Sequence, residues 1–176
     1  LDAIRCGIGL VTEDRKQSGI IAPMCLRENM TIASLNAVSR KGIFNRKRER
    51  DMAEEYYGKL QVKAGGIEDN IMNLSGGNQQ KIVLSKWLMK DIKVLFLDEP
   101  TRGVDVGAKV EIYHIITDLA RRGVAVVMIS SELPELLGMC DRILVFARGK
   151  LWGNIRREDF SQERIMRAAT GIEKYG

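Results

Sequence analysis

The alternation of apolar and polar stretches along the chain predicts an α/β protein. Short apolar runs of strand length recur between longer segments whose apolar residues repeat at helical spacing. The strand-like runs are residues 7–11, 94–97, 124–129, 142–147 and 151–155. The runs 94–97 and 124–129 are apolar throughout, which is typical of parallel strands buried on both faces. We therefore expect a mainly parallel sheet in which both of these strands are fully buried.

Helical spacing is clearest in three segments. The helix expected over residues 45–62 carries an apolar stripe, as do the helices that follow Gly77 and Gly107. The members of these stripes are Ala53, Tyr56, Tyr57 and Leu60; Val83, Leu84, Trp87 and Leu88; and Ala108, Ile112, Ile115, Ile116 and Leu119. Residues 19–30 lack such a pattern and are expected to be irregular. The last two strand-like runs predict a C-terminal β-hairpin with a Gly-containing turn, and residues 161–169 predict a closing helix.

Two features place candidate chemistry along this pattern. The Leu-Ser-Gly-Gly turn at residues 74–77 opens a helix, where free backbone N–H groups and the positive dipole end favour an anion. Asp98 and Glu99 follow strand 94–97, and ligands collect at the carboxyl ends of parallel strands. One carboxylate can hold Mg²⁺ on a phosphate chain while the next orients or deprotonates the attacking water. Each feature alone is commonly a plain turn or a helix N-terminus, but together they favour a site that binds and hydrolyses a phosphate chain.

Length and charge narrow the function classes. The 176 residues suffice for one domain with a sizeable core, and a first residue other than Met, close to a strand-like run, indicates a fragment. The net charge is +5, from 28 basic and 23 acidic residues, and the densest basic run is residues 46–50. Nucleic-acid binding usually shows a basic stripe. This run starts an amphipathic segment instead, so it is read as a solvated helix face.

The cysteines and the single histidine indicate no metal or redox site. Cys6, Cys25 and Cys140 are scattered without metal-ligand spacing, and we expect buried thiols in a reducing cytosol. His114 is far from any acidic or nucleophilic cluster and is expected at the surface or in packing. No signal peptide is visible, and the longest purely apolar run, 124–129, is far too short to span a bilayer. Any membrane role is therefore expected to come through a partner.

The stretch from Leu74 to Asp105 resembles the signature loop, Walker B strand and D-loop of an ABC-type ATPase. Two segments, Gly-Gly-Asn-Gln-Gln-Lys at 76–81 and Pro-Thr-Arg-Gly-Val-Asp-Val-Gly-Ala-Lys at 100–109, narrow the resemblance further. They are similar to the second nucleotide-binding half of the tandem ATPases that drive bacterial monosaccharide importers of the ribose, galactose or xylose type. The similarity extends from about Gly9 to Gly171. It implies a P-loop NTPase-type sheet with a helical subdomain inserted at about residues 26–80.

The resemblance also implies what the site residues do. ATP is sandwiched between two ATPase halves, and the signature loop of each half contacts the nucleotide bound to the other. The residues of this signature loop are Ser75, Gly76 and Gly77, which meet the γ-phosphate, and the neighbouring Asn78. Asp105 in the D-loop, residues 101–105, couples the two sites. Asp98 holds Mg²⁺, directly or through water, and Glu99 polarises the attacking water.

Three departures from the family pattern accompany the resemblance. The Q-loop position that usually holds Gln carries Glu13, and the position of the switch histidine carries Ser131, whose hydroxyl supplies no imidazolium charge. Ser131 alternatively caps the helix expected near Pro134. A P-loop, Gly-x-x-x-x-Gly-Lys-Ser/Thr, is missing, since residues 103–109 have the wrong spacing. The family places it before the Q-loop, so residues 1–176 are read as a partial ATPase domain that binds ATP poorly when isolated.

The partners follow from the same resemblance. They are a second ABC ATPase half in a head-to-tail dimer, transmembrane permease subunits and, indirectly, a periplasmic sugar-binding protein, with no nucleic acid. The start of the helical subdomain, residues 27–35, contacts the coupling helix of the membrane subunit in the family. Met and Leu side chains there are either a docking surface or core. The implied place is peripheral, at the cytoplasmic face of the bacterial inner membrane.

Two alternatives stay open. One is a degenerate, regulatory ABC half with little hydrolysis, which Glu13 and Ser131 support and the intact pair Asp98 and Glu99 opposes. The other is a soluble ABC ATPase of DNA repair or translation. Such proteins tend to carry long coiled coils or a charged linker between tandem halves, and the sequence shows neither.

Overall fold

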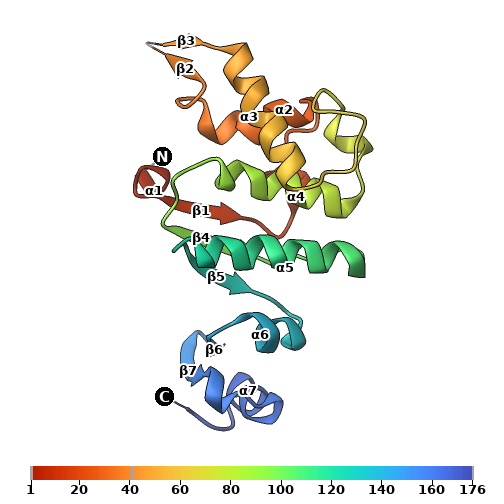
Figure 1. Cartoon of the computed structure of the whole chain (residues 1–176). Coiled ribbons are helices and arrows are strands. Elements are labelled where there is room, and N and C mark those ends of the chain that lie inside the picture. Colours follow the sequence, from red (N-terminus) through yellow and green to blue (C-terminus); the bar gives the residue numbers. More distant parts are fainter. Residues whose placement is uncertain (1, 41, 176) are drawn as a thin grey trace. The chain divides into compact units, whose positions relative to one another are not determined.

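The computed structural model describes residues 2–40 and 42–175, and Figure 1 shows the path of the chain. Contacts within the chain divide it into two compact units, Leu1–Ile129 and Ser130–Gly176. Each unit has its own β-sheet and its own packed helices.

Three parallel strands form the main sheet of the first unit. They are β1 (Ile8–Val11), β4 (Val94–Asp98) and β5 (Ala125–Ile129), in the order β1-β4-β5. The register pairs Ile8 with Val94, and Val94 with Ala125, so the carboxyl ends of all three strands meet at one edge. The parallel sheet predicted from the apolar runs is confirmed, and Asp98 lies at its carboxyl edge.

Only one face of this sheet is buried. The residues on the buried face include Val11, Leu95 and Leu97, each at most 1% exposed. Those on the other face are Leu10, Phe96, Val127 and Ile129, which are 37% to 52% exposed. The expectation that runs 94–97 and 124–129 are buried on both faces is therefore wrong for this chain. Strands that are apolar on both sides need a cover on both, and among the described residues the side chains of the second face are exposed.

Helices and short turns make up the rest of the first unit. The three main helices are α3 (Arg46–Lys59), α4 (Gly76–Leu88) and α5 (Val106–Arg121). The shorter elements are α1 (Asp2–Arg5), η1 (Arg15–Gly19), α2 (Leu26–Thr31), η2 (Ile32–Ser34), η3 (Ile71–Asn73) and a hairpin of β2 (Ser39–Arg40) and β3 (Ile43–Phe44). Helix α3 confirms the helix predicted over residues 45–62. Asn45 is its N-cap, because the Asn45 side-chain oxygen accepts the N–H of Arg48 at 3.0 Å.

The segment predicted to be irregular, residues 19–30, contains most of helix α2. The Glu28 carboxylate accepts the N–H of Cys25 at 3.1 Å, which satisfies a backbone group at the start of this helix. The Leu26 and Met30 side chains are fully buried. Within residues 27–35, where the sequence left docking surface or core open, Met30 is therefore core, whereas Leu35 is 43% exposed.

Helix α4 is largely buried, and α2 and α5 both pack against it. The predicted inner residues Val83 and Leu84 are at most 1% exposed. Lys81 is also buried, which requires a partner for its charge. Its Nζ lies 2.6 Å from a carboxylate oxygen of Glu111 on α5 and donates to the Gln61 carbonyl at 3.1 Å. This ion pair fixes α4 against α5.

The second unit is a β-hairpin packed on two helices. Its elements are α6 (Leu133–Met139), β6 (Arg142–Ala147), β7 (Lys150–Arg156), η4 (Arg157–Asp159) and α7 (Gln162–Ala169). The antiparallel hairpin and the closing helix are those that the sequence predicted. The core consists of Ile143, Val145 and Ile155 from the strands with Ile165 and Ala168 from α7.

The thiols and the histidine are less buried than core residues. Cys6 is exposed, and Cys25 and Cys140 are half-buried, so the expectation of buried thiols is wrong. Cys6 lies in the loop between the short helix α1 and β1. His114 is exposed on α5, in line with the surface role expected for it. Within the described ranges, no helix combines the length and apolar character needed to cross a membrane.

Candidate functional site

The signature turn, residues 74–77, forms the N-terminus of α4. Ser75 is the N-cap, and its hydroxyl oxygen accepts the backbone N–H of Asn78 at 3.5 Å and the Asn78 side-chain amide at 3.0 Å. The side-chain oxygen of Asn78 (Oδ1) in turn accepts the backbone N–H of Lys63 at 3.0 Å. The Ser75 side chain is therefore held beside the first N–H groups of the helix, which have no partner within it and favour an anion.

The two glycines of this turn allow close packing against the D-loop and α5. A Cβ added at Gly76 would lie 2.6 Å from the guanidinium of Arg15 and 2.9 Å from the carbonyl oxygen of Gly103. A Cβ added at Gly77 would lie 2.4 Å from the Cβ of Ala108. Neither contact leaves room for a side chain. The structure therefore brings the signature turn and the D-loop into contact. The spacing of the two segments in the sequence does not predict this contact.

Replacing Gly77 by Ala is expected to destabilise the folded protein by about 1–3 kcal/mol, because the new methyl group overlaps Ala108. Chemical denaturation of the full-length protein measures the loss, and the second substitution Ala108→Gly should restore most of it. Gly58→Ala in α3 is the matched control, since no atom lies within 4 Å of a Cβ built there. A Gly77→Ala variant as stable as wild type would contradict the close packing.

The two candidate carboxylates follow each other at the carboxyl edge of the sheet. Asp98 ends β4, and Glu99 has a backbone φ of +47°, a left-handed conformation that is unfavourable for a residue with a side chain. The Glu99 N–H donates to the Ile129 carbonyl at 2.9 Å, and the Glu99 carbonyl accepts the N–H of Arg102 at 3.1 Å. These bonds hold the strained turn. Asp105 caps α5, with its carboxylate accepting the N–H of Ala108 at 3.0 Å.

The Q-loop segment folds against the D-loop. The Glu13 carboxylate forms an ion pair with the guanidinium of Arg102. Arg15 donates to the Arg102 carbonyl at 2.8 Å and to the Gly103 carbonyl at 3.3 Å. The Arg15 side chain also donates to the Gln79 side-chain oxygen of α4 at 3.3 Å. Sequence reasoning singled out neither Arg15 nor Gln79, because no motif or spacing links residues that are 64 positions apart.

The carboxylates at the sheet edge could hold Mg²⁺ only together with ligands that this chain does not supply. Within residues 2–40 and 42–175, no three His, Cys, Asp or Glu side chains converge on one point. Asp98 supplies one carboxylate at the sheet edge, and Mg²⁺ commonly binds one or two carboxylates together with phosphate oxygens and water. The site therefore fits a metal ion that arrives with a phosphate chain.

Ser131 lies in the second unit and does not cap helix α6, the alternative role that the sequence offered for it. The Ser130 hydroxyl donates to the Glu135 carboxylate at 2.6 Å and accepts the N–H of Glu132 at 3.0 Å. Helix α6 starts at Leu133, with Glu132 at the N-cap position. The alternative that Ser131 caps this helix is therefore wrong, and Ser131 is exposed.

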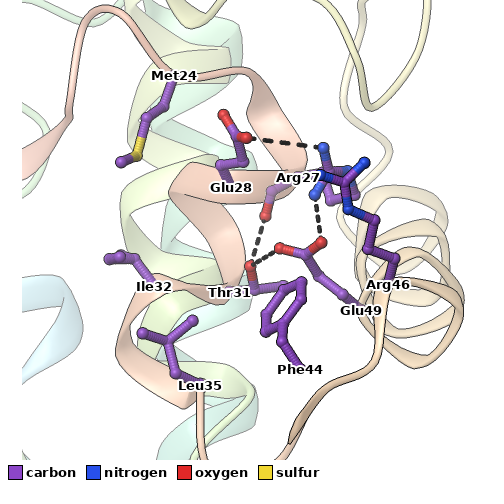
Figure 2. Close-up of a pocket in the computed structure, with 9 residues that line it drawn as sticks. All are labelled: Met24, Arg27, Glu28, Thr31, Ile32, Leu35, Phe44, Arg46 and Glu49. Carbon is purple, nitrogen blue, oxygen red and sulfur yellow. Dashed lines mark hydrogen bonds and ion pairs between the residues drawn. The ribbon is translucent and has the colours of Figure 1, made fainter. Parts of the chain in front are cut away.

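A groove of about 340 Å³ lies in the helical part of the first unit (Figure 2). It is lined by Met24, Arg27, Glu28, Thr31, Ile32, Leu35, Phe44, Arg46 and Glu49. Figure 2 shows Met24, Ile32 and Leu35 along one side, and the charged side chains of Arg27, Arg46 and Glu49 on the other, with Phe44 beside Glu49. Arg27 pairs with the buried Glu49 and with Glu68 at 3.0 Å. The hydrogen bond between Arg27 and Glu68 raises the pKa of the guanidinium and lowers the pKa of the carboxyl, so both stay charged.

The comparisons with known proteins point to one family. The family model described as "ABC transporter" matches residues 3–102. A putative ribose/galactose/methyl galactoside import ATP-binding protein of Halalkalibacterium halodurans is 49% identical over 98% of this chain. A ribose import ATP-binding protein of Bacillus licheniformis and a xylose import ATP-binding protein of Thermoanaerobacter pseudethanolicus are each 51% identical over 97% of it. The chain covers 33%, 34% and 34% of these three relatives, about a third of their length.

Proposed function

We propose a function on the premise that the comparisons supply: the chain belongs to the ABC transporter family. In our proposal the protein that contains it hydrolyses ATP to drive monosaccharide import across the bacterial inner membrane, and this chain is part of its second ATPase half. The observation that carries the proposal is the packing of the signature turn on the D-loop, next to a strand that ends in Asp98 and Glu99. The names of the relatives, which specify ribose, galactose and xylose import, support the substrate class.

The signature turn of this chain serves the nucleotide held by the partner half. Its free N–H groups and the positive end of the α4 dipole attract the γ-phosphate. Ser75 accepts from Asn78, so its own hydroxyl hydrogen is left to donate to a phosphate oxygen. Asp105, fixed as the cap of α5, lies 3.7 Å from a Cβ built at Gly77, and in our proposal it couples the two halves.

The carboxylates act on the nucleotide of this half. When bound, Mg²⁺ neutralises phosphate charge and orients the γ-phosphate. Asp98 holds it from the end of β4, and Glu99 accepts a hydrogen bond from the attacking water and takes its proton. The strained backbone of Glu99 supports this role, because such conformations cluster where chemistry needs a side chain aimed at a fixed point.

A regulatory half with little hydrolysis is the second candidate, and one observation favours it. Glu13, at the Q-loop position, forms an ion pair with Arg102 and is thereby drawn toward the D-loop. Ser131, at the switch position, supplies a hydroxyl in place of an imidazole. Both departures weaken the polar environment of the nucleotide that Glu99 would act on. We therefore propose slow hydrolysis at this site and faster hydrolysis where the signature turn contributes.

The groove in Figure 2 is the proposed dock for the coupling helix of the permease. Its apolar side chains, with Leu35 43% and Phe44 43% exposed, suit the apolar face of a helix. Arg46 and Glu28 supply polar partners. Docking there places the full-length protein at the cytoplasmic face of the membrane, where the permease receives sugar from a periplasmic binding protein.

Leu35→Glu in the full-length protein is expected to lower co-purification with the permease, and sugar uptake by cells, at least about tenfold, because it buries a charge in the apolar side of the groove. Uptake of labelled ribose, galactose and xylose is measured with the permease co-expressed. Ile43→Glu, an equal change at a residue 75% exposed and outside the groove lining, is the control and should keep uptake. Equal uptake in wild type and Leu35→Glu would refute the dock, and absence of uptake in wild type for all three sugars would refute the substrate class.

A further inference from the structure

The side chain of Arg15 hydrogen-bonds both to α4, the helix that the signature turn opens, and to the D-loop. Its guanidinium reaches three acceptors. They are the Gln79 side-chain oxygen at 3.3 Å, the Arg102 carbonyl at 2.8 Å and the Gly103 carbonyl at 3.3 Å. A Cβ at Gly76 would lie 2.6 Å from the same guanidinium. Arg15 therefore fills the space between the start of α4 and the loop that follows the two candidate carboxylates.

Both ends of this bridge are fixed by other contacts. Gln79 is 3% exposed, and its amide nitrogen donates to the Ile71 carbonyl at 3.2 Å, which points its oxygen toward Arg15. The Arg102 N–H donates to the Glu99 carbonyl at 3.1 Å. A continuous series of hydrogen bonds therefore runs from the signature helix through Arg15 to the backbone of Glu99.

The segment that carries Arg15 is itself braced. The Asp14 carboxylate accepts the N–H groups of Lys16 at 2.9 Å and Gln17 at 3.1 Å and so caps η1. The hydroxyls of Thr12 and Ser18 share a hydrogen bond of 2.6 Å across the same turn. The backbone of Arg15 is therefore held in place before its side chain reaches the D-loop, which lowers the entropy lost in forming the bridge.

We propose that Arg15 is a positioning residue that holds the signature turn and the Glu99 turn in one fixed relation. This inference rests on the proposed function. The signature turn serves the nucleotide of the partner half and Glu99 serves the nucleotide of this half, so the bridge couples the two composite sites within a single chain. A planar guanidinium offers several N–H groups in a fixed geometry that matches three acceptors, whereas a lysine ammonium is a single point charge. The bridge is therefore specific to arginine.

The test uses Arg15→Lys and Arg15→Gln in the full-length protein, with Lys16→Gln as the matched control. Lys16 is the neighbouring cation, is exposed, and has no described contact through its side chain. Hydrogen exchange at the amides of Arg102 and Val104, which close the two turns of the D-loop, should speed up about tenfold in both Arg15 variants, because one charge-assisted hydrogen bond carries about that factor. Exchange in α3 should stay within about twofold. The control should leave both regions unchanged.

ATP hydrolysis by the same variants separates positioning from binding. Arg15 does not touch the nucleotide in the proposal, so kcat should fall about tenfold while KM for ATP changes less than about threefold. Gln79→Leu removes the other end of the bridge and should reproduce part of the fall, with a clearly non-additive effect when combined with Arg15→Gln. Gln79→Leu also keeps the test open if an Arg15 variant does not fold.

Three outcomes decide the inference. Unchanged exchange at Arg102 and Val104 overturns it, whatever the ATPase rate. Faster exchange with an unchanged kcat also overturns it, because the bridge would then have no bearing on turnover. If the Arg15 variants exchange faster but the wild-type full-length protein has no ATPase activity, the bridge is supported and the proposed function is refuted.

Discussion

Ser75→Arg is expected to remove most of the ATPase activity of the full-length protein, to below about a tenth of the wild-type rate. The serine hydroxyl caps α4 and lies beside its free N–H groups. Arginine removes the cap, brings a cation to the positive end of the helix dipole and occupies the place proposed for the γ-phosphate of the partner half. Loss of one preorganised donor to developing charge commonly costs 10²- to 10³-fold in rate, and here the phosphate contact is lost as a whole.

Steady-state phosphate release by the full-length variant measures this effect. Ser161→Arg is the matched control, because Ser161 is also a helix N-cap whose hydroxyl accepts a backbone N–H, at the start of α7. The control loses a cap and gains the same charge, but lies outside the proposed site and should keep its activity. Similar losses in both variants would assign the effect to a destabilised fold.

Glu99→Gln is expected to slow hydrolysis at the site of this half by roughly 10²- to 10⁴-fold, while ATP binding stays largely intact. The substitution keeps size and hydrogen-bonding shape but removes the basic oxygen, and the N–H and C=O groups of residue 99 keep their partners Ile129 and Arg102. Single-turnover hydrolysis at this site measures the change. A single-turnover rate equal to that of the wild type would show that Glu99 is not the general base.

The total activity of the Glu99→Gln variant should fall distinctly less than that of Ser75→Arg. Glu99 acts at the site where Glu13 and Ser131 replace the usual Gln and His, and we propose that this site is already slow. The signature turn serves the other, faster site. Steady-state rates of the two variants, measured side by side, decide which site is faster. A larger loss of activity in Glu99→Gln than in Ser75→Arg would mean that the asymmetry is assigned the wrong way round.

The spacing of apolar residues and the turn-forming residues are sufficient to predict most of the secondary structure, because helices, strands and tight turns depend mainly on residues close together in the sequence. Helix α3 (Arg46–Lys59) lies within the predicted range 45–62, with Asn45 as its N-cap. The hairpin of the second unit turns at Arg148 and Gly149, both at positive φ, where a Gly is favoured. The adjacent carboxylates Asp98 and Glu99 end a parallel strand as predicted.

The failed expectations concern what surrounds an element. An apolar run shows that a strand can be buried on both faces, but not that a second cover is present, and Phe96 and Ile129 are exposed. The N-cap position of α6 belongs to Glu132 and not to Ser131, a difference of one residue that only backbone geometry decides. Arg15 had no sequence signal, because its three acceptors include two backbone carbonyls, which every residue type offers.

A Cβ built at Gly77 would lie only 2.4 Å from the Cβ of Ala108, and this close packing bears on how such sites can change during evolution or by design. The first turn of α4 and the first turn of α5 form a matched surface, so a larger residue at either position requires a smaller one, or a displaced helix, at the other. Position 108 is therefore limited to the smallest side chains as long as position 77 stays in contact. A signature sequence transplanted from another ATPase without its own α5 would have the right motif but would pack poorly against the first turn of the existing α5. The first turns of α4 and α5 are therefore expected to change together, and not the glycine-rich motif alone.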